Sequence, residues 1–184
     1  MRRRYTAMAV AFITACVAAF ATATTSTAAA AVEQDDLALV VCVGTADQNY
    51  SPPLTTTNRT THITSTHDYP SCSDVQLDPQ YPTVTSASTA LDYTTEANCL
   101  VAPPVTHPTL DLLWSNGQHS YAAVTTVVTR STGSTIVTSI GTIGSGLFAG
   151  HIVHEVVVYP SLDVLGCLTT GVTNVSGITT LEVV

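Results

Sequence analysis

The chain has 184 residues with 13 acidic residues against five basic ones, a net charge of −8 at pH 7. The basic residues are all Arg, and three of them lie at positions 2 to 4, so the remainder is strongly acidic. Because affinity for nucleic acids and anionic lipid surfaces depends on Lys and Arg neutralising phosphates, this balance argues against both kinds of partner.

The first 31 residues predict a secretory signal peptide. Arg2, Arg3 and Arg4 form a basic start, an apolar run covers residues 5–20, and a small-residue stretch ends at Ala31, where we expect cleavage. The apolar run is shorter than the roughly 20 residues of a membrane-spanning helix. The sequence before Cys16 also resembles a lipobox, which leaves a lipoprotein anchored through Cys16 as an alternative to a secreted, extracellular protein. The apolar run continues after Cys16, where a polar tether is expected.

Residues 32–184 predict a single all-β domain. They are rich in Thr, Val, Ile and Ser, and β-branched side chains favour strands. We find no convincing apolar helical period, and turn signals recur about every 12 residues, which is typical of a sandwich or barrel. We expect a two-sheet, immunoglobulin-like β-sandwich of eight or nine strands, with a closed β-barrel as the alternative.

In the first half, strands are expected at 37–43, at 59–67 and, once or twice, within 83–96. Pro52 and Pro53 argue against a central strand at their positions, because Pro donates no ladder hydrogen bond. The Pro-rich segment 103–108 predicts a stiff, extended connector. We interpret it as a crossover between the two sheets.

In the second half, strands are expected at 110–115, 118–130, 134–143, 151–159 and 178–184. Asn116-Gly117 predicts a hairpin with a type I′ turn, because both residues tolerate positive φ. We expect a Gly-rich corner at 144–150 and a loop at 161–170.

Four cysteines follow the signal segment, and an even number in an exported protein predicts disulfides. Four cysteines allow three pairings. We favour Cys42–Cys72 and Cys99–Cys167, one local bridge and one long-range bridge. The chain has no C-x-x-C pair, so a zinc site is not expected.

Candidate chemical groups are few. His151, His154 and Glu155 are crowded together, but the H-x-x-H-E order is not that of a zinc protease. In a strand His154 points away from His151 and Glu155, so we interpret them as partly exposed polar positions. His62 and His67, next to Asp68, likewise fall on opposite faces.

The remaining candidates are weaker. His107 and His119 show no evident partner. Ser145 lies between two glycines but lacks the G-x-S-x-G pattern, so we expect a bend there. Trp114 is expected in the core, although an aromatic platform for sugars, built with Tyr121, Phe148 and Tyr159, is an alternative. We therefore assign no catalytic, cofactor-binding or metal-ligating residue from the sequence.

Several short segments carry a resemblance. They are Cys-Val-Gly-Thr at 42–45, Tyr-Ser-Pro-Pro-Leu-Thr at 50–55, Trp-Ser-Asn-Gly-Gln at 114–118, Ser-Gly-Leu-Phe-Ala-Gly at 145–150 and the run at 167–173. Together they resemble small secreted β-rich proteins of unknown function from Streptomyces-type actinobacteria. The resemblance implies secretion and no particular activity.

We expect a secreted, monomeric, non-enzymatic protein that acts as an extracellular binding or envelope-associated module for a small molecule, a glycan or a protein, without a cofactor. The alternative is a secreted hydrolase whose carboxylate and His side chains are brought together by the fold. That alternative requires two or three of six residues to converge in a cleft: His62, His67, Asp68, His119, His151 and Glu155.

Overall fold

The computed structural model of the protein describes residues 39–74, 81–131, 133–162 and 164–184. The expected signal peptide at 1–31, with Cys16, lies outside these residues, as do the first two positions of the strand expected at 37–43. The elements are β1 (Val40–Leu54), β2 (Arg59–Asp74), β3 (Ala87–Ala97), β4 (Thr109–Trp114), β5 (His119–Ser131), β6 (Ser134–Gly146), β7 (Ile152–Pro160), α1 (Val164–Leu168) and β8 (Val172–Val183).

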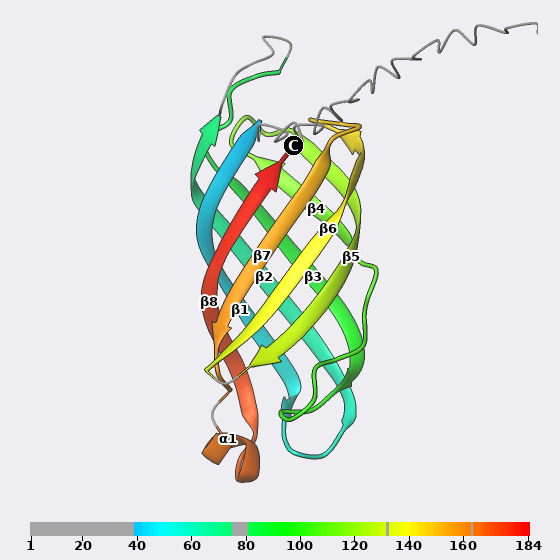
Figure 1. The fold of residues 1–184 in the computed structure, drawn as a ribbon, viewed down its shortest axis with the longest axis vertical. Coiled ribbons are helices and arrows are strands. Elements are labelled where there is room, and N and C mark those ends of the chain that lie inside the picture. Colours follow the sequence, from blue (N-terminus) through cyan, green and yellow to red (C-terminus); the bar gives the residue numbers. More distant parts are fainter. Residues whose placement is uncertain (1–38, 75–80, 132, 163) are drawn as a thin grey trace, which may run out of the picture. The chain divides into compact units, whose positions relative to one another are not determined.

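The strands form a closed antiparallel barrel in which each strand pairs with the next and β8 returns to β1 (Figure 1). The closing ladder runs from Val40 opposite Val183 to Asn49 opposite Asn174. The all-β prediction and the barrel alternative are therefore confirmed. The immunoglobulin-like sandwich is wrong, because β1 has a partner on both sides and no edge separates two sheets.

Inward and outward side chains alternate along the strands. On β7, for example, Val153, Glu155, Val157 and Tyr159 are buried while their neighbours are more exposed. A barrel of about eight strands has an interior just wide enough to be filled by side chains or to hold one small ligand. Here side chains fill one end of the barrel, and the interior also contains a cavity.

The end that holds the C-terminus is filled by an apolar cluster. Trp114 lies at its centre with its ring edge-to-face on Phe148, at 5.2 Å between ring centroids. The Trp114 indole nitrogen donates to the Ser120 hydroxyl at 2.7 Å, so its polar group is satisfied in the core. The expectation of a buried Trp114 is confirmed. The aromatic platform is wrong, because Tyr121 is on the outer surface and Tyr159 inside.

The hairpin at Asn116-Gly117 is confirmed, but the type I′ turn is wrong. Gly117 has a φ of 78°, whereas Asn116 is not among the residues with positive φ. The Gly117 N–H donates to the Trp114 carbonyl at 2.9 Å. This geometry fits a three-residue loop that ends in a left-handed Gly.

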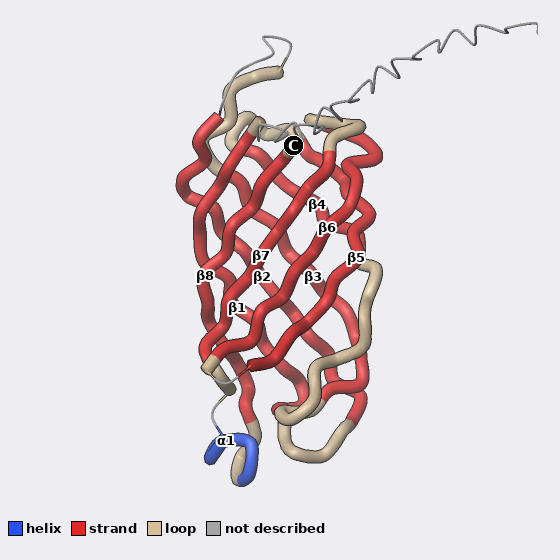
Figure 2. The backbone as a smooth tube through the Cα atoms, in the orientation of Figure 1, coloured by secondary structure: helices blue, strands red, loops and turns tan. Residues whose placement is uncertain are grey.

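Two Pro-rich segments differ from their expected roles. β1 continues through Pro52 and Pro53 because the ladder to β2 ends at Ser51 and the ladder to β8 is interrupted between Asn49 and Leu54, so no donor is needed there. The connector expected at 103–108 is part of the segment 98–108 between β3 and β4, and this whole segment is called the connector below. It is not a crossover between sheets, because it joins neighbouring strands (Figure 2). The expected loop at 161–170 includes the one-turn helix α1.

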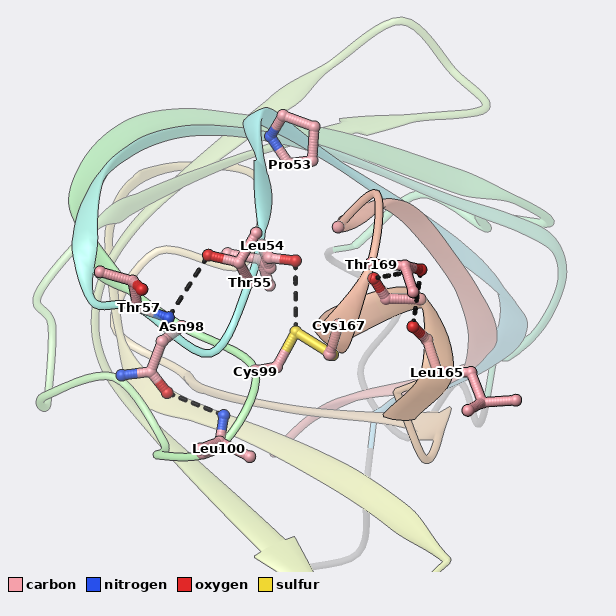
Figure 3. The surroundings of a disulfide bond; sticks show 12 residues. Pro53, Leu54, Thr55, Thr57, Asn98, Cys99, Leu100, Leu165, Cys167 and Thr169 are labelled. Atoms are coloured by element: carbon pink, nitrogen blue, oxygen red, sulfur yellow. Dashed lines mark hydrogen bonds between the residues drawn. A yellow bond between two sulfur atoms is a disulfide. The ribbon is translucent and has the colours of Figure 1, made fainter.

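Disulfides join Cys42 to Cys72 and Cys99 to Cys167, the pairing favoured from the sequence. The first links residues that face each other on β1 and β2. The second ties the start of the connector to α1, with the Cys99 sulfur 3.3 Å from the Leu54 carbonyl oxygen (Figure 3). Both bridges are compatible with an oxidising, extracellular location.

Within the residues that the structure describes, no helix combines the length and the apolar character needed to cross a membrane.

Candidate functional site

The barrel interior contains a cavity of about 290 Å³, close to the lower limit of ordinary small-molecule pockets. It lies between the apolar cluster around Trp114 and a smaller cluster formed by Leu54, Ala97, Cys99 and Cys167 at the end near α1. Its walls combine aliphatic side chains such as Ile63, Leu91, Val128, Val137 and Val157 with a set of polar ones. Such a mixture suits a ligand that is mostly apolar and carries a few polar groups.

Beside this cavity the barrel wall is incomplete. β3 pairs with β4 only through Ala87, Ser88 and Thr89, so the rest of β3 has no strand between it and β5. The connector fills this space and is held to β5 by two backbone hydrogen bonds between Thr106 and Thr126, at 2.8 and 3.1 Å.

The connector also supplies part of the cavity lining through Pro103, Pro104 and Pro108. Pro has no N–H, so these residues cannot complete a ladder toward β3 as a strand would. The connector runs alongside β5 in Figure 2.

A buried hydrogen-bond network crosses the barrel beside the cavity, and Ser65, His67 and Glu155 of this network line the cavity. His67 Nδ1 lies 2.7 Å from Glu155 Oε1, and His67 Nε2 lies 2.8 Å from the Ser65 hydroxyl. The Tyr69 hydroxyl donates to the same Glu155 oxygen at 2.5 Å and lies 3.1 Å from the Thr179 hydroxyl. Each of these polar side chains is buried, so the network satisfies groups that would be costly to leave unpaired.

The polar wall of the cavity includes the phenol groups of Tyr50, Tyr93 and Tyr159, and Tyr69 belongs to the adjoining network. Burial raises the pKa values of Tyr50, Tyr93 and Tyr159 above the ordinary range for Tyr, and burial together with Glu155 raises the pKa of Tyr69. These hydroxyl groups therefore keep their protons near neutral pH. They are hydrogen-bond donors inside an otherwise largely aliphatic space.

Arg130 of β5 contributes the cation of the cavity wall. One of its terminal nitrogens donates to the Asn98 carbonyl at 2.9 Å, while Nε is buried without a hydrogen-bond partner. Burial lowers the pKa of its guanidinium. Among the described residues, no carboxylate lies within ion-pair distance of Arg130. A half-buried guanidinium of this kind favours an anionic partner.

Of the six residues required by the hydrolase alternative, the structure brings only His67 and Glu155 together. The interpretation of Glu155 as partly exposed is wrong, because its position on β7 points inward and it is 1% exposed. The opposite orientation of His62 and His67 is confirmed, with His62 on the outer surface beside Asp92 at 2.6 Å. Asp68 is exposed on the outer surface.

The other candidates lie apart from the network. His119 is 2.6 Å from Asp111 on the outer surface, so His119 does have a partner. His154 is 3.9 Å from Glu182. His151 contacts the Tyr81 hydroxyl at 3.0 Å. His107 lines the cavity at the connector and lies 3.3 Å from the Thr125 hydroxyl.

Ser145, the other hydroxyl candidate, is exposed near the end of β6.

Sequence reasoning missed Ser65, Tyr69 and Arg130, and it considered Tyr159 only for an aromatic platform. Ser65, His67 and Tyr69 alternate on β2, which indicates a shared face. Only the closed barrel makes that face an interior one opposite Glu155.

Within the described ranges, no group of three or more His, Cys, Asp or Glu side chains is arranged to hold a metal ion. Comparison of the chain with models of known protein families, with curated proteins and with solved structures gives no match.

Proposed function

We propose that this protein is an exported carrier that binds a small, mostly aliphatic molecule with an anionic group, such as a carboxylate, inside the barrel. The observation that carries this proposal is Arg130, a guanidinium on the cavity wall without a carboxylate partner among the described residues. A ligand carboxylate would supply the missing partner and accept bonds from the phenols.

The aliphatic side chains of the cavity support the apolar part of the ligand. Burial of apolar surface contributes about 25 cal/mol per Å² removed from water. The anionic group would add a charge-assisted hydrogen bond at Arg130, which is stronger than a neutral one. The ligand would then lie with its chain among the Val and Leu side chains and its head near the connector.

A matched pair of ligands tests the binding proposal. Octanoate and octanol have the same chain and differ in head group. A ligand that binds only the folded protein raises its thermal unfolding temperature. We expect octanoate to raise this temperature more than octanol does, because only octanoate carries a carboxylate for Arg130. Arg130→Gln should abolish the preference for octanoate. Equal shifts for both ligands in the wild-type protein, or no shift with either, would contradict the proposal.

Arg59→Gln is the matched control. Arg59 also donates to a backbone carbonyl, that of Pro53, and also has a buried Nε without a partner, but it does not line the cavity. We expect it to retain the wild-type preference for octanoate. Loss of the preference in both variants would mean that the effect comes from net charge and not from the cavity.

Export is supported by the basic and apolar segments of residues 1–31 and by the compatibility of the disulfides with an oxidising compartment. The intact mass of protein collected from culture supernatant tests it. A mass that corresponds to a chain beginning near Val32 is expected. An acylated chain beginning at Cys16 would instead establish the lipoprotein alternative.

A further inference from the structure

Three buried side chains that line the cavity form a continuous hydrogen-bonded series. The Ser65 hydroxyl lies 2.8 Å from His67 Nε2, and His67 Nδ1 lies 2.7 Å from Glu155 Oε1. The imidazole is thus fixed between a hydroxyl on one side and a carboxylate on the other. This order of groups is the arrangement in which a hydroxyl becomes a nucleophile and an imidazole its base.

The barrel builds this series from two distant strands. Ser65 and His67 are two residues apart on β2 and therefore share the inner face, whereas Glu155 is 88 residues after His67 on β7. β2 and β7 are not neighbours in the barrel, since β1 and β8 separate them. The contact therefore spans the interior, beside the cavity that all three residues line.

The surroundings determine which nitrogen of His67 carries the proton. A carboxylate only accepts hydrogen bonds, so Nδ1 carries a proton and donates to Glu155, and in the neutral ring Nε2 is left without a proton. Nε2 is then the acceptor for the Ser65 hydroxyl. Tyr69 donates to the same Glu155 oxygen, which holds the carboxylate in place. Glu155 is thus a positioning residue for His67 and does not itself need to change its protonation.

A donor is also present for the negative charge that develops when a hydroxyl attacks a carbonyl. The Tyr159 phenol lines the same cavity as Ser65, and burial raises its pKa, so it remains protonated. The backbone of Ser65 is paired on both sides, opposite Gln48 and Leu91, so its amide is committed to the sheet. A side-chain donor such as Tyr159 therefore takes the part that backbone amides have in other acyl-transfer sites.

We propose that Ser65 is a nucleophile that hydrolyses small carboxylic esters in the cavity, which rests on the proposed binding of an acyl ligand there. Ser65 Oγ bonds to the ester carbonyl carbon while its proton passes to His67 Nε2. The bond to the alcohol oxygen breaks, and the alcohol leaves with that proton. Water then attacks the acyl-Ser65 ester, gives a proton to Nε2 and releases the carboxylic acid. The proton that water gave to Nε2 passes to Ser65 Oγ as the acid leaves. The acid product is the class of ligand that Arg130 favours.

A serine-directed alkyl fluorophosphonate tests the nucleophile directly on the disulfide-bonded protein. Attack by Ser65 forms an oxygen–phosphorus bond and releases fluoride, so we expect one adduct per chain, mapped to the Ser65 peptide by mass spectrometry. Ser65→Ala should remove the adduct. His67→Asn should slow labelling by about 10²-fold or more, the usual contribution of a general base. Glu155→Gln should also slow labelling, and the thermal stability of this variant is measured alongside to separate the effect from unfolding.

Two outer-surface variants are matched controls. Ser145 is a more exposed serine on β6, and His62 forms an equally short contact with Asp92 outside the barrel. Ser145→Ala and His62→Asn should label like the wild-type protein. A label on Ser145, or a label spread over several serines, would overturn the proposal, because it would show that reactivity follows exposure.

Turnover of para-nitrophenyl butyrate supplies a second readout in case a variant fails to fold. The wild-type protein should release about one equivalent of nitrophenolate in a burst, followed by slower turnover. If octanoate binds but neither adduct nor burst is seen, the nucleophile is overturned and the binding role stands. If octanoate does not bind either, both proposals are overturned.

Discussion

Glu155 is the side chain on which the polar half of the barrel interior depends. It is 1% exposed, it accepts a hydrogen bond from Tyr69, and it faces His67 at 2.7 Å. A carboxylate removed from water is costly unless donors surround it. Tyr69 and His67 supply those donors, so the three side chains stabilise the barrel only as a group.

Removal of one donor should reveal this dependence. We expect Tyr69→Phe to lower the free energy of unfolding by about 1–3 kcal/mol, because the Glu155 oxygen loses a buried hydrogen bond. Tyr121→Phe removes a phenol from the outer surface and should change it by less than about 0.5 kcal/mol. Urea unfolding of both variants measures the difference. Similar values for the two would contradict the role assigned to Tyr69.

The buried phenols also predict how stability depends on pH. Burial raises the pKa values of Tyr50, Tyr93 and Tyr159 in the folded protein, and those of the unfolded chain lie near pH 10. Above about pH 10 the unfolded state therefore binds fewer protons than the folded state. The stabilisation is complete below that pH and is lost as the pH rises.

Urea unfolding at about pH 8 and about pH 11 measures this loss. Each buried phenol adds a slope of up to about 1.4 kcal/mol per pH unit. Tyr159→Phe has one such phenol fewer, so its stability should fall less steeply with pH than that of the wild-type protein. An unchanged slope would show that Tyr159 is not shielded from water in the folded state.

At the scale of the single element, β6 depends on a glycine where it approaches β5. A Cβ atom on Gly141 would lie 2.0 Å from the Ala123 carbonyl oxygen, so no other residue fits without movement of the backbone. Gly144 on the same strand has its nearest atom at 3.8 Å. The two glycines therefore differ in what an added methyl group meets.

Alanine at each position tests this difference. Gly141→Ala should destabilise the barrel by about 1–3 kcal/mol or more through overpacking, while Gly144→Ala should stay within about 0.5 kcal/mol of the wild-type protein. Thermal and urea unfolding of the pair measure it. Equal effects would mean that β5 and β6 are farther apart than the structure places them.

The strands themselves were partly predictable from local sequence. A strand was expected only at 59–67, whereas β2 extends past Pro70. The strand continues to Asp74 because its ladder to β3 ends at Tyr69 opposite Ala87, so Pro70 needs no donor on that side. A Pro in the sequence cannot reveal whether the neighbouring strand is still present.

At the scale of the whole molecule, alternation of apolar and polar residues predicted strands but not their closure. A sandwich and a barrel both require one buried face per strand. They differ in the ladder between β1 and β8, which joins residues such as Val40 and Val183 from opposite ends of the chain. No local pattern encodes that pairing.

The candidate site depends on the same closure. Alternation on β2 indicates that Ser65 and His67 share a face, but whether that face meets solvent or an interior is set by the barrel. Glu155 was therefore interpreted as partly exposed, although the closed wall places it against His67. A polar residue at an apolar-patterned strand position can belong to a buried network inside a small barrel, and Glu155 is such a residue.

Because β8 pairs with β1, the order in which the chain visits the strands is not essential to the barrel. Leu39 N donates to the Val183 carbonyl at 2.7 Å, so these positions could be joined by a short Gly- and Ser-rich linker. A circular permutant opened at the exposed Asn116-Gly117 turn should fold and retain the near-ultraviolet circular dichroism of buried Trp114. One opened between Ser139 and Ile140, inside β6, should not. The termini could then be moved to other exposed turns by circular permutation without loss of the fold.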